Sequence, residues 1–235
     1  GKLSFSWPKD ATGNPLNVNR EPYDPLFAFG FGLSYGAPSE LAKLSEDPGI
    51  PAELMSTGSF FDKGTAVAPW SLRVSNGSDS TRITTVPAES VGGRVKVTAV
   101  DDQVQEGARR FVFAGDGKGT VQITSEGAVD LSREANGDVM LLLRVKREGD
   151  LPKDLKLGVA CGAGCAGSVP VADTLGALPA GRFQTVGIPL KCFAKNGADV
   201  SKVNEALVLE TEGKLDLAFS QVKLGTVADK VHSCN

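Results

Sequence analysis

From Trp70 onward, hydrophobic and polar side chains alternate along short segments that glycine, proline and asparagine separate. In residues 71–75, leucine and valine alternate with arginine and serine, and Asn76-Gly77 follows, a dipeptide typical of β-hairpin turns. The same alternation predicts further strands over residues 81–86, 94–100, 111–113, 121–123, 155–161, 183–193, 205–211 and 215–224.

Residues 138–147 carry the strongest strand pattern in the chain. Apolar side chains fill one face and part of the other, with Val139, Leu141, Leu143 and Val145 on the first and Met140 and Leu142 on the second. We therefore expect a central strand that is covered on both sides. Short helical turns are predicted at 172–178 and 199–204. About ten strands at roughly ten-residue spacing, with few helices, indicate an all-β fold, an antiparallel β-sandwich.

The N-terminal region has a different character. Residues 23–35, YDPLFAFGFGLSY, are aromatic and interrupted by glycine, and they are expected to lie against an apolar surface. Residues 1–22 are polar and rich in proline and asparagine, so they cannot supply it. We therefore interpret residues 1–36 as the tail of a preceding domain, 37–69 as a connector with a short helical segment after Ser39, and 70–235 as the β-sandwich domain.

Composition excludes two classes of partner. The 235 residues carry a formal net charge of −3, so no basic field attracts nucleic acid. No apolar run approaches the roughly 18 residues that a membrane span needs. A hydrophobic content of 41% is enough for a packed core, and we expect no nucleic-acid partner and no membrane partner.

Two N-terminal motifs carry a family resemblance. Residues 1–8, GKLSFSWP, and residues 25–35, PLFAFGFGLSY, resemble the end of the second domain of glycoside hydrolase family three, which contains β-glucosidases and exo-β-glucanases. Downstream, VDLSREANGDVMLLLRV, GVACGAGCAG and KCFAKNGADVSKVN resemble the extra C-terminal β-domain that periplasmic or secreted exo-glucosidases of this family append. The resemblance implies a jelly roll of the carbohydrate-binding-module kind, with an N-terminal extension from the preceding domain, in a periplasmic or secreted protein.

The resemblance also implies that the catalytic residues lie in other domains. Retaining glycosidases need two carboxyl groups across the scissile bond, and in this family both would lie upstream of Gly1, so no catalytic residue is assigned among the 28 Asp and Glu. We expect a non-catalytic accessory domain of an exo-acting, retaining β-glucan glucohydrolase cleaving β-1,3 or β-1,4 bonds. It would stabilise the catalytic domains of the same polypeptide or shape their outer substrate subsites. The alternatives are an independent carbohydrate-binding module for β-glucan or gluco-oligosaccharide, and a purely structural or dimerisation domain.

Candidate substrate-binding residues are few. Trp70 is the single tryptophan beyond the connector, where no tyrosine occurs, and it serves either to stack on a sugar or to pack between domains. A loop at 100–110 supplies Asp101, Asp102, Arg109 and Arg110, which could hydrogen-bond a glucan chain. Asp101 and Asp102, with Asp216 on the last strand, are also candidate ligands of a structural calcium ion, against the alternative of a solvated acidic loop. No other cofactor is expected.

The remaining candidates concern cysteine, histidine and glycine. The spacing Cys161-Gly-Ala-Gly-Cys165 suits a tight turn closed by a disulfide, with zinc binding or buried free thiols as alternatives, and four cysteines allow three pairings. His232, the single histidine, is expected to be an exposed structural residue in a polar tail. Residues 115–119, GDGKG, lack the context of a phosphate-binding loop and are predicted to form a glycine-rich hairpin turn.

Overall fold

The computed structural model describes residues 1–9, 16–19, 21, 23–32, 36 and 58–234 and divides into two compact units, Gly1–Ser56 and Thr57–Asn235. The predicted helical segment after Ser39 and most of the predicted connector lie outside the described residues. The second unit also contains the end of that connector, because the strands nearest residue 60 belong to its sheets.

The N-terminal unit contains one small antiparallel ladder between β1 (Trp7–Pro8) and β2 (Pro25–Phe27). The Tyr23 hydroxyl shares a hydrogen bond of 2.7 Å with Ser6 Oγ. Many of its large apolar side chains remain in contact with solvent, namely Phe5, Trp7, Val18, Leu26, Phe29 and Phe31. These side chains include the aromatic residues for which the sequence predicted an apolar partner surface.

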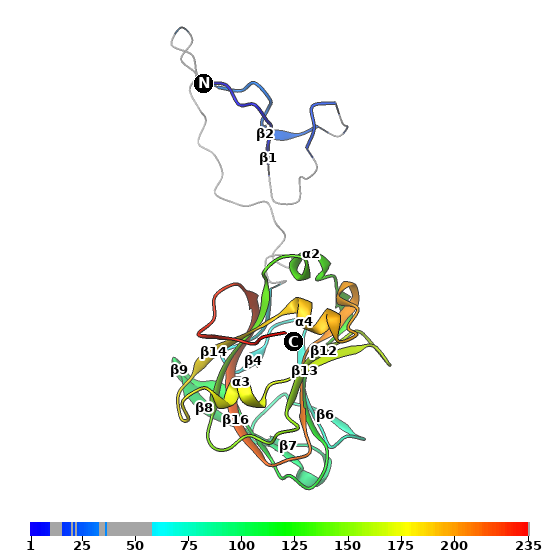
Figure 1. Cartoon of the computed structure of the whole chain (residues 1–235), viewed down its shortest axis with the longest axis vertical. Helices are drawn as coiled ribbons and strands as arrows, with labels where there is room; N and C mark the ends of the chain where they lie inside the picture. Colours follow the sequence, from blue (N-terminus) through cyan, green and yellow to red (C-terminus); the bar gives the residue numbers. More distant parts are fainter. Residues whose placement is uncertain (10–15, 20, 22, 33–35, 37–57, 235) are drawn as a thin grey trace. The chain divides into compact units, whose positions relative to one another are not determined.

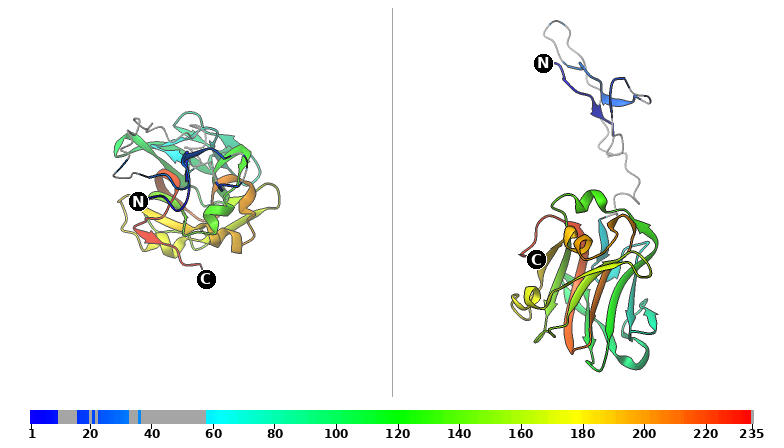
Figure 2. Two further views of the ribbon diagram at one scale, coloured as in Figure 1. Left: turned by 90° about the horizontal axis from the view of Figure 1, so that it is seen from above. Right: turned by 45° about the vertical axis from the view of Figure 1, so that its right-hand side comes forward.

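The C-terminal unit is a sandwich of two largely antiparallel sheets (Figures 1 and 2). The first sheet has six strands in the order β13-β12-β15-β10-β5-β6. Their bounds are β5 Ser71–Ser75, β6 Ser80–Arg82, β10 Gly119–Val129, β12 Lys156–Ala160, β13 Ala166–Pro170 and β15 Val203–Thr211. The predicted turn at Asn76-Gly77 is confirmed, because Asn76 Oδ1 accepts hydrogen bonds from the Ser78 and Asp79 amides between β5 and β6.

The second sheet has nine strands, with β17-β14-β11-β16-β9-β8-β7 as its main path, β3 paired with β16, and β4 paired with β3. Their bounds are β3 Ser59–Asp62, β4 Thr65–Ala66, β7 Ala88–Glu89, β8 Val95–Asp102, β9 Val104–Phe113, β11 Met140–Arg147, β14 Gln184–Pro189, β16 Leu215–Gly225 and β17 Lys230–Val231. The predicted central strand is confirmed: β11 lies between β14 and β16, and its apolar side chains are buried on both faces.

The core lies between the sheets and follows from the alternation in the sequence. Every second side chain of each long strand points inward, and the inward set is buried: Leu72, Val74, Val121, Ile123, Leu157, Val159, Leu207 and Leu209 from the first sheet, and Val95, Val97, Phe111, Leu141, Leu143, Val186, Leu217 and Phe219 from the second. Phe111 and Phe219 stack with ring centroids 4.6 Å apart. This shared core explains why the all-β sandwich prediction is confirmed.

Two local predictions were wrong. Residues 115–119 do not close a hairpin, because β9 belongs to the nine-stranded sheet and β10 to the six-stranded sheet, so the glycine-rich turn carries the chain from one sheet to the other. The strand predicted over 183–193 ends at Pro189, and α4 (Leu190–Lys195) follows with Leu190 and Phe193 buried at helical spacing. Alternation and helical spacing are both short-range patterns, so neither reveals which sheet a strand joins.

Short helical segments connect the strands. They are α2 Ser132–Ala135, α3 Ala172–Gly176, and the 3-10 turns η1 Val91–Gly93 and η2 Val200–Lys202. The turns predicted at 172–178 and 199–204 are thereby confirmed. Among the residues that the structure describes, no helix has the length and apolar character required to cross a membrane.

Candidate functional site

Trp70 is a core residue, which corrects its predicted role in sugar binding. Its side chain is only 6% exposed, and its ring meets that of Phe60 edge to face at a centroid distance of 4.9 Å. Phe60 lies on β3 and is itself buried. A sugar ring stacks on an aromatic face that solvent can reach, so Trp70 contributes packing instead.

The hairpin loop predicted at 100–110 belongs to the hairpin of strands β8 and β9, with its turn around Gln103 at φ 60°. Asp101 Oδ1 accepts a hydrogen bond of 2.7 Å from the Glu106 amide and so holds this turn. Arg109 stays with its own hairpin, donating to the carbonyls of Glu106 and Ala108 at 2.9 and 3.1 Å. Asp101 and Arg109 are therefore hairpin residues, whereas Asp102 and Arg110 point to other partners.

Asp102 is the centre of a three-residue network on the outer face of the nine-stranded sheet. Arg144 on β11 donates from Nε and Nη2 to its two carboxylate oxygens at 2.8 and 2.9 Å, and Ser220 Oγ on β16 donates at 2.6 Å. The Asp102 side chain is only 6% exposed. Burial alone raises its pKa, but the hydrogen bonds from Arg144 and Ser220, with the charges of Arg144 and Lys146, outweigh it and hold the pKa below its usual range.

A second bidentate pair lies on the same face. Arg110 on β9 donates from Nε and Nη2 to the carboxylate of Asp216 on β16, at 2.8 and 2.5 Å. The hydrogen bond to Asp216 raises the pKa of Arg110 against the opposing effect of burial. Next to them in register, Lys146 on β11 pairs with Glu148 at 2.6 Å.

The three candidate calcium ligands, Asp101, Asp102 and Asp216, are each engaged by protein groups. Asp102 and Asp216 each direct both carboxylate oxygens at an arginine, and Asp101 is held in the β8–β9 turn. In the part of the chain that the structure describes, no group of three or more His, Cys, Asp or Glu side chains could hold a metal ion. The local sequence pattern could not reveal these two ion pairs, because Arg144 lies 42 positions from Asp102 and Arg110 lies 106 positions from Asp216.

We call these side chains the charged face: Asp102, Arg110, Arg144, Lys146, Asp216 and Ser220. Two of its cations lie over the half-buried ring of Phe183, at 5.6 Å for Arg144 Cζ and 5.4 Å for Lys146 Nζ. Arg144, Lys146, Ser220 and Phe183 are functional candidates that the sequence analysis missed. A signal existed, since the outward face of the 138–147 strand changes from apolar at Met140 and Leu142 to cationic at Arg144 and Lys146.

The charged face offers hydrogen-bond donors that are fixed before any ligand arrives. Guanidinium, ammonium and hydroxyl groups lie side by side on a regular sheet, and each is held by a carboxylate or by the Phe183 ring. Groups that are held in place lose little conformational freedom on binding. Such a surface is chemically suited to the hydroxyl groups of a sugar chain.

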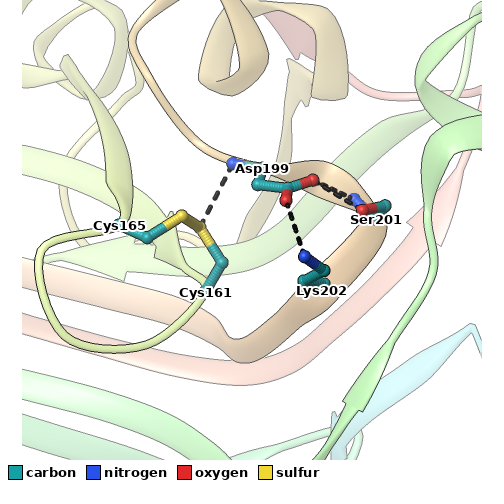
Figure 3. The surroundings of a disulfide bond; sticks show 5 residues. All are labelled: Cys161, Cys165, Asp199, Ser201 and Lys202. Atoms are coloured by element: carbon teal, nitrogen blue, oxygen red, sulfur yellow. Dashed lines mark hydrogen bonds and ion pairs between the residues drawn. A yellow bond between two sulfur atoms is a disulfide. The ribbon is translucent and has the colours of Figure 1, made fainter.

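Both pairs of cysteines form disulfides. Cys161–Cys165 closes the turn between β12 and β13, as the spacing predicted, and free thiols are excluded because the second pair is Cys192–Cys234. Figure 3 shows that the first disulfide lies beside Asp199, whose amide donates to Cys161 Sγ at 3.1 Å. Asp199 in turn accepts from the Ser201 amide and hydroxyl at 3.1 and 2.6 Å and so fixes the η2 turn. This disulfide is therefore part of the loop structure at one end of the six-stranded sheet.

His232 is half-buried, which corrects its prediction as an exposed residue. Its Nδ1 lies 2.8 Å from the Thr174 hydroxyl, and its amide donates to the Gly187 carbonyl at 2.8 Å. Burial lowers the pKa of its imidazole. The polar composition of the tail suggested exposure, but the pairing of β17 with β14 draws the histidine toward the body of the unit.

Comparison with known proteins identifies relatives of this architecture. The structure superposes on the exo-1,3/1,4-β-glucanase ExoP from a Pseudoalteromonas species with a TM-score of 0.63 and 23% identity, covering 100% of this chain and 28% of the enzyme. The separate extra C-terminal domain of that glucanase aligns with a TM-score of 0.60 and 15% identity over 75% of this chain and 94% of the domain. A family 30 carbohydrate-binding module aligns with a TM-score of 0.53 and 18% identity over 74% of this chain and 90% of the module.

These likenesses are likenesses of fold, and the chain spans only 28% of the length of the glucanase. No curated protein sequence matches the chain. A family model described as galactose-binding domain-like, Exop_C, matches residues 68–224, which is more than half of the chain and includes most strands of the sandwich. The chain therefore belongs to the galactose-binding domain-like family Exop_C.

Proposed function

We propose that the chain is a non-catalytic accessory domain of an exo-acting β-glucan glucohydrolase and that its charged face contacts the glucan. The observation that carries the proposal is the array of fixed donors on that face, centred on Arg110 and Arg144. Membership of the Exop_C family and the likeness to the extra C-terminal domain of an exo-1,3/1,4-β-glucanase support it. The role needs no cofactor.

The proposed parent enzyme is a retaining glycosidase of family three that cleaves β-1,3 or β-1,4 bonds. Its two catalytic carboxyl groups would come from other domains of the same polypeptide. The accessory domain would place its charged face against the part of the substrate that extends from the active site. This arrangement shapes the outer subsites and leaves the chemistry to the catalytic domains.

We also propose a periplasmic or secreted location. The support is the pair of disulfides, Cys161–Cys165 and Cys192–Cys234, which together use every cysteine of the chain. Disulfides persist in oxidising compartments and are rare where glutathione and thioredoxin keep thiols reduced. A glucan-degrading enzyme in such a compartment would meet its polymeric substrate directly.

Isothermal titration of the 235-residue chain with laminari- and cello-oligosaccharides tests the proposal. We expect saturable millimolar binding that Arg110→Gln weakens about tenfold, because a hydrogen bond from a charged group is worth about 1.5–3 kcal/mol. Arg82→Gln, on β6 of the six-stranded sheet, is the matched control and should bind as the wild type does. Equal weakening by the two variants, or no binding by the wild type, would refute a glycan contact at the charged face.

A second candidate function, a purely structural role, is favoured by the N-terminal unit. Phe5 and Phe29 are 60% and 59% exposed there, and such apolar surface is suited to packing on another domain. In that case, Phe5→Ser combined with Phe29→Ser in the parent enzyme would lower the melting temperature of its catalytic domains, and the isolated chain would bind no oligosaccharide. The titration with oligosaccharides therefore separates the two candidates.

A further inference from the structure

An open groove lies between α3 and the C-terminal tail, which we define as residues 226–234. Its volume is about 520 Å³, and its lining includes Pro170, Asp173, Thr174, Lys230, His232 and Ser233. None of the charged-face side chains lines it. In Figures 1 and 2 the yellow α3 and the red tail lie on the same side of the sandwich. The groove has a size within the range of small-molecule sites.

The tail wall of the groove is firmly attached. β17 runs parallel to β14, with Lys230 opposite Val186. Asp229 and Thr185 exchange two hydrogen bonds, one from the Asp229 amide at 2.9 Å and one from the Thr185 amide to Oδ2 at 2.8 Å. The disulfide Cys192–Cys234 joins the end of the tail to α4. The tail is therefore held at both ends of the stretch that lines the groove.

The opposite wall is equally fixed. The Val171 amide donates to the Leu155 carbonyl at 3.0 Å, and Leu175 of α3 is buried in the core. The hydrogen bond between Thr174 and His232 Nδ1, at 2.8 Å, joins the two walls across the groove. A cavity with two anchored walls needs little reorganisation when a ligand enters.

The lining mixes acceptors, donors and small apolar surfaces. Asp173 supplies a carboxylate, Lys230 an ammonium, and Thr174 and Ser233 supply hydroxyls. Because burial lowers the pKa of His232, its ring is neutral near pH 7 and carries one N–H donor and one acceptor nitrogen. Pro170 and neighbouring alanines line the same cavity. Hydroxyl groups can both donate and accept, and the C–H faces of a sugar ring pack on small apolar side chains.

We propose that this groove is a second binding site, which holds one neutral sugar unit whose hydroxyl groups donate to Asp173, accept from Lys230 and hydrogen-bond with His232. The site is separate from the charged face and would take the end of a short gluco-oligosaccharide. The choice of a glucosyl unit rests on the proposed function, whereas the groove and its hydroxyl-binding chemistry do not.

His232 makes the proposal directly measurable, because it is the only histidine in the chain. Its ring signals in a nitrogen-15-labelled sample therefore report on this groove alone. Titration with laminaribiose or cellobiose at pH 7 should shift these signals saturably. If the His232 signals stay unshifted at sugar concentrations that saturate the shifts of the backbone amide signals, the proposal is overturned. A stronger response to glucuronate than to glucose would overturn the assignment to a neutral sugar.

Asp173→Asn should weaken the His232-detected binding at least tenfold while the fold is retained, because Asp173 is exposed at the groove. The matched control is Asp150→Asn, which makes the same change of charge at an exposed position outside the lining and should leave the titration unchanged. Equal titration curves for Asp173→Asn and the wild type would contradict the proposed contact.

The disulfide provides a second, independent test. Cys192→Ser combined with Cys234→Ser releases the end of the tail and should abolish the His232 response. Cys161→Ser combined with Cys165→Ser removes a disulfide outside the groove and should preserve it. A persistent response in the first double variant, with its sandwich verified by amide spectra, would refute a site built by the tail.

These variants separate a failure of the proposed groove site from a failure of the proposed contact at the charged face. Arg110→Gln should weaken binding at the charged face and leave the His232 titration intact. If Arg110→Gln and Asp173→Asn each remove only their own signal, both sites stand. If His232 alone responds to sugar, the contact at the charged face fails and the groove stands, and the reverse result removes the groove only.

Discussion

The two tryptophans of the chain show how differently its two units use apolar side chains. Trp7 in the N-terminal unit is 47% exposed, whereas Trp70 in the C-terminal unit is 6% exposed. Trp7 lies near Phe5 and Phe27 at centroid distances of 6.4 and 6.1 Å, yet solvent still reaches this small cluster. Trp70 is enclosed by a core to which both sheets contribute. The C-terminal unit therefore contains its own stabilising core, whereas the described part of the N-terminal unit presents its aromatic residues outward.

Substitution of each tryptophan gives the largest expected contrast. Trp70→Ala should lower the free energy of unfolding of the sandwich by about 3–5 kcal/mol, because it removes buried contacts and leaves a cavity. Trp7→Ala should leave the same transition unchanged, since its side chain is already in contact with solvent. Urea unfolding followed by far-UV circular dichroism measures both. If the two variants destabilise equally, the assignment of separate stability to the C-terminal unit is wrong.

Two ion pairs offer a second and smaller contrast. Asp102 is nearly buried against Arg144, whereas Asp24 pairs with Lys9 at 2.9 Å with both side chains exposed. Asp102→Asn should cost the sandwich about 2 kcal/mol at pH 7, since it weakens hydrogen bonds to a charged group. Asp24→Asn should leave the unfolding transition of the sandwich unchanged, because exposed ion pairs contribute little to the free energy of unfolding.

The pH dependence of the Asp102 effect has a definite sign. The folded-state pKa of Asp102 is lowered, so its contribution is fully present above the unfolded-state pKa of about 3.9 and is lost as the pH falls through the folded-state value. The stability difference between the wild type and Asp102→Asn should thus stay constant from pH 7 to about pH 5 and shrink below about pH 4. Urea unfolding of the wild type and Asp102→Asn at several pH values measures this stability difference. A difference that grows toward low pH would contradict the network of Asp102, Arg144 and Ser220.

The smallest expected effect comes from removing the N-terminal unit. A chain of residues 57–235 should unfold within about 0.5 kcal/mol of the full chain, because a unit with its own core folds without its neighbour. Removal should also raise solubility, since it eliminates exposed aromatic residues such as Phe5 and Phe29. A loss of several kcal/mol on removal would show that the sandwich depends on the N-terminal unit.

The sequence alone determined those features that depend on neighbouring residues. Alternation over 138–147 identified a central strand, and Asn76-Gly77 identified a turn, because strand faces and turn conformations repeat or close within a few residues. The four-residue separation of Cys161 and Cys165 identified one disulfide for the same reason. The motifs that resemble the accessory β-domain of exo-glucosidases also indicated the family to which the chain belongs.

The tertiary structure alone decided which distant segments meet. Asp62 on β3 lies opposite Gln221 on β16, 159 positions later. Ser220 donates a hydrogen bond to Asp102, 118 positions earlier. The local sequence pattern around these residues does not predict either contact. The same holds for Cys192–Cys234 and for the tail that places His232 against Thr174. Periodicity predicts which face of a strand is buried. Which strand lies beside it depends on how all the strands pack together around one core. The pairing of distant strands assembles both the charged face and the groove. The sequence offered some side chains of the charged face as candidates, but not the contacts between them.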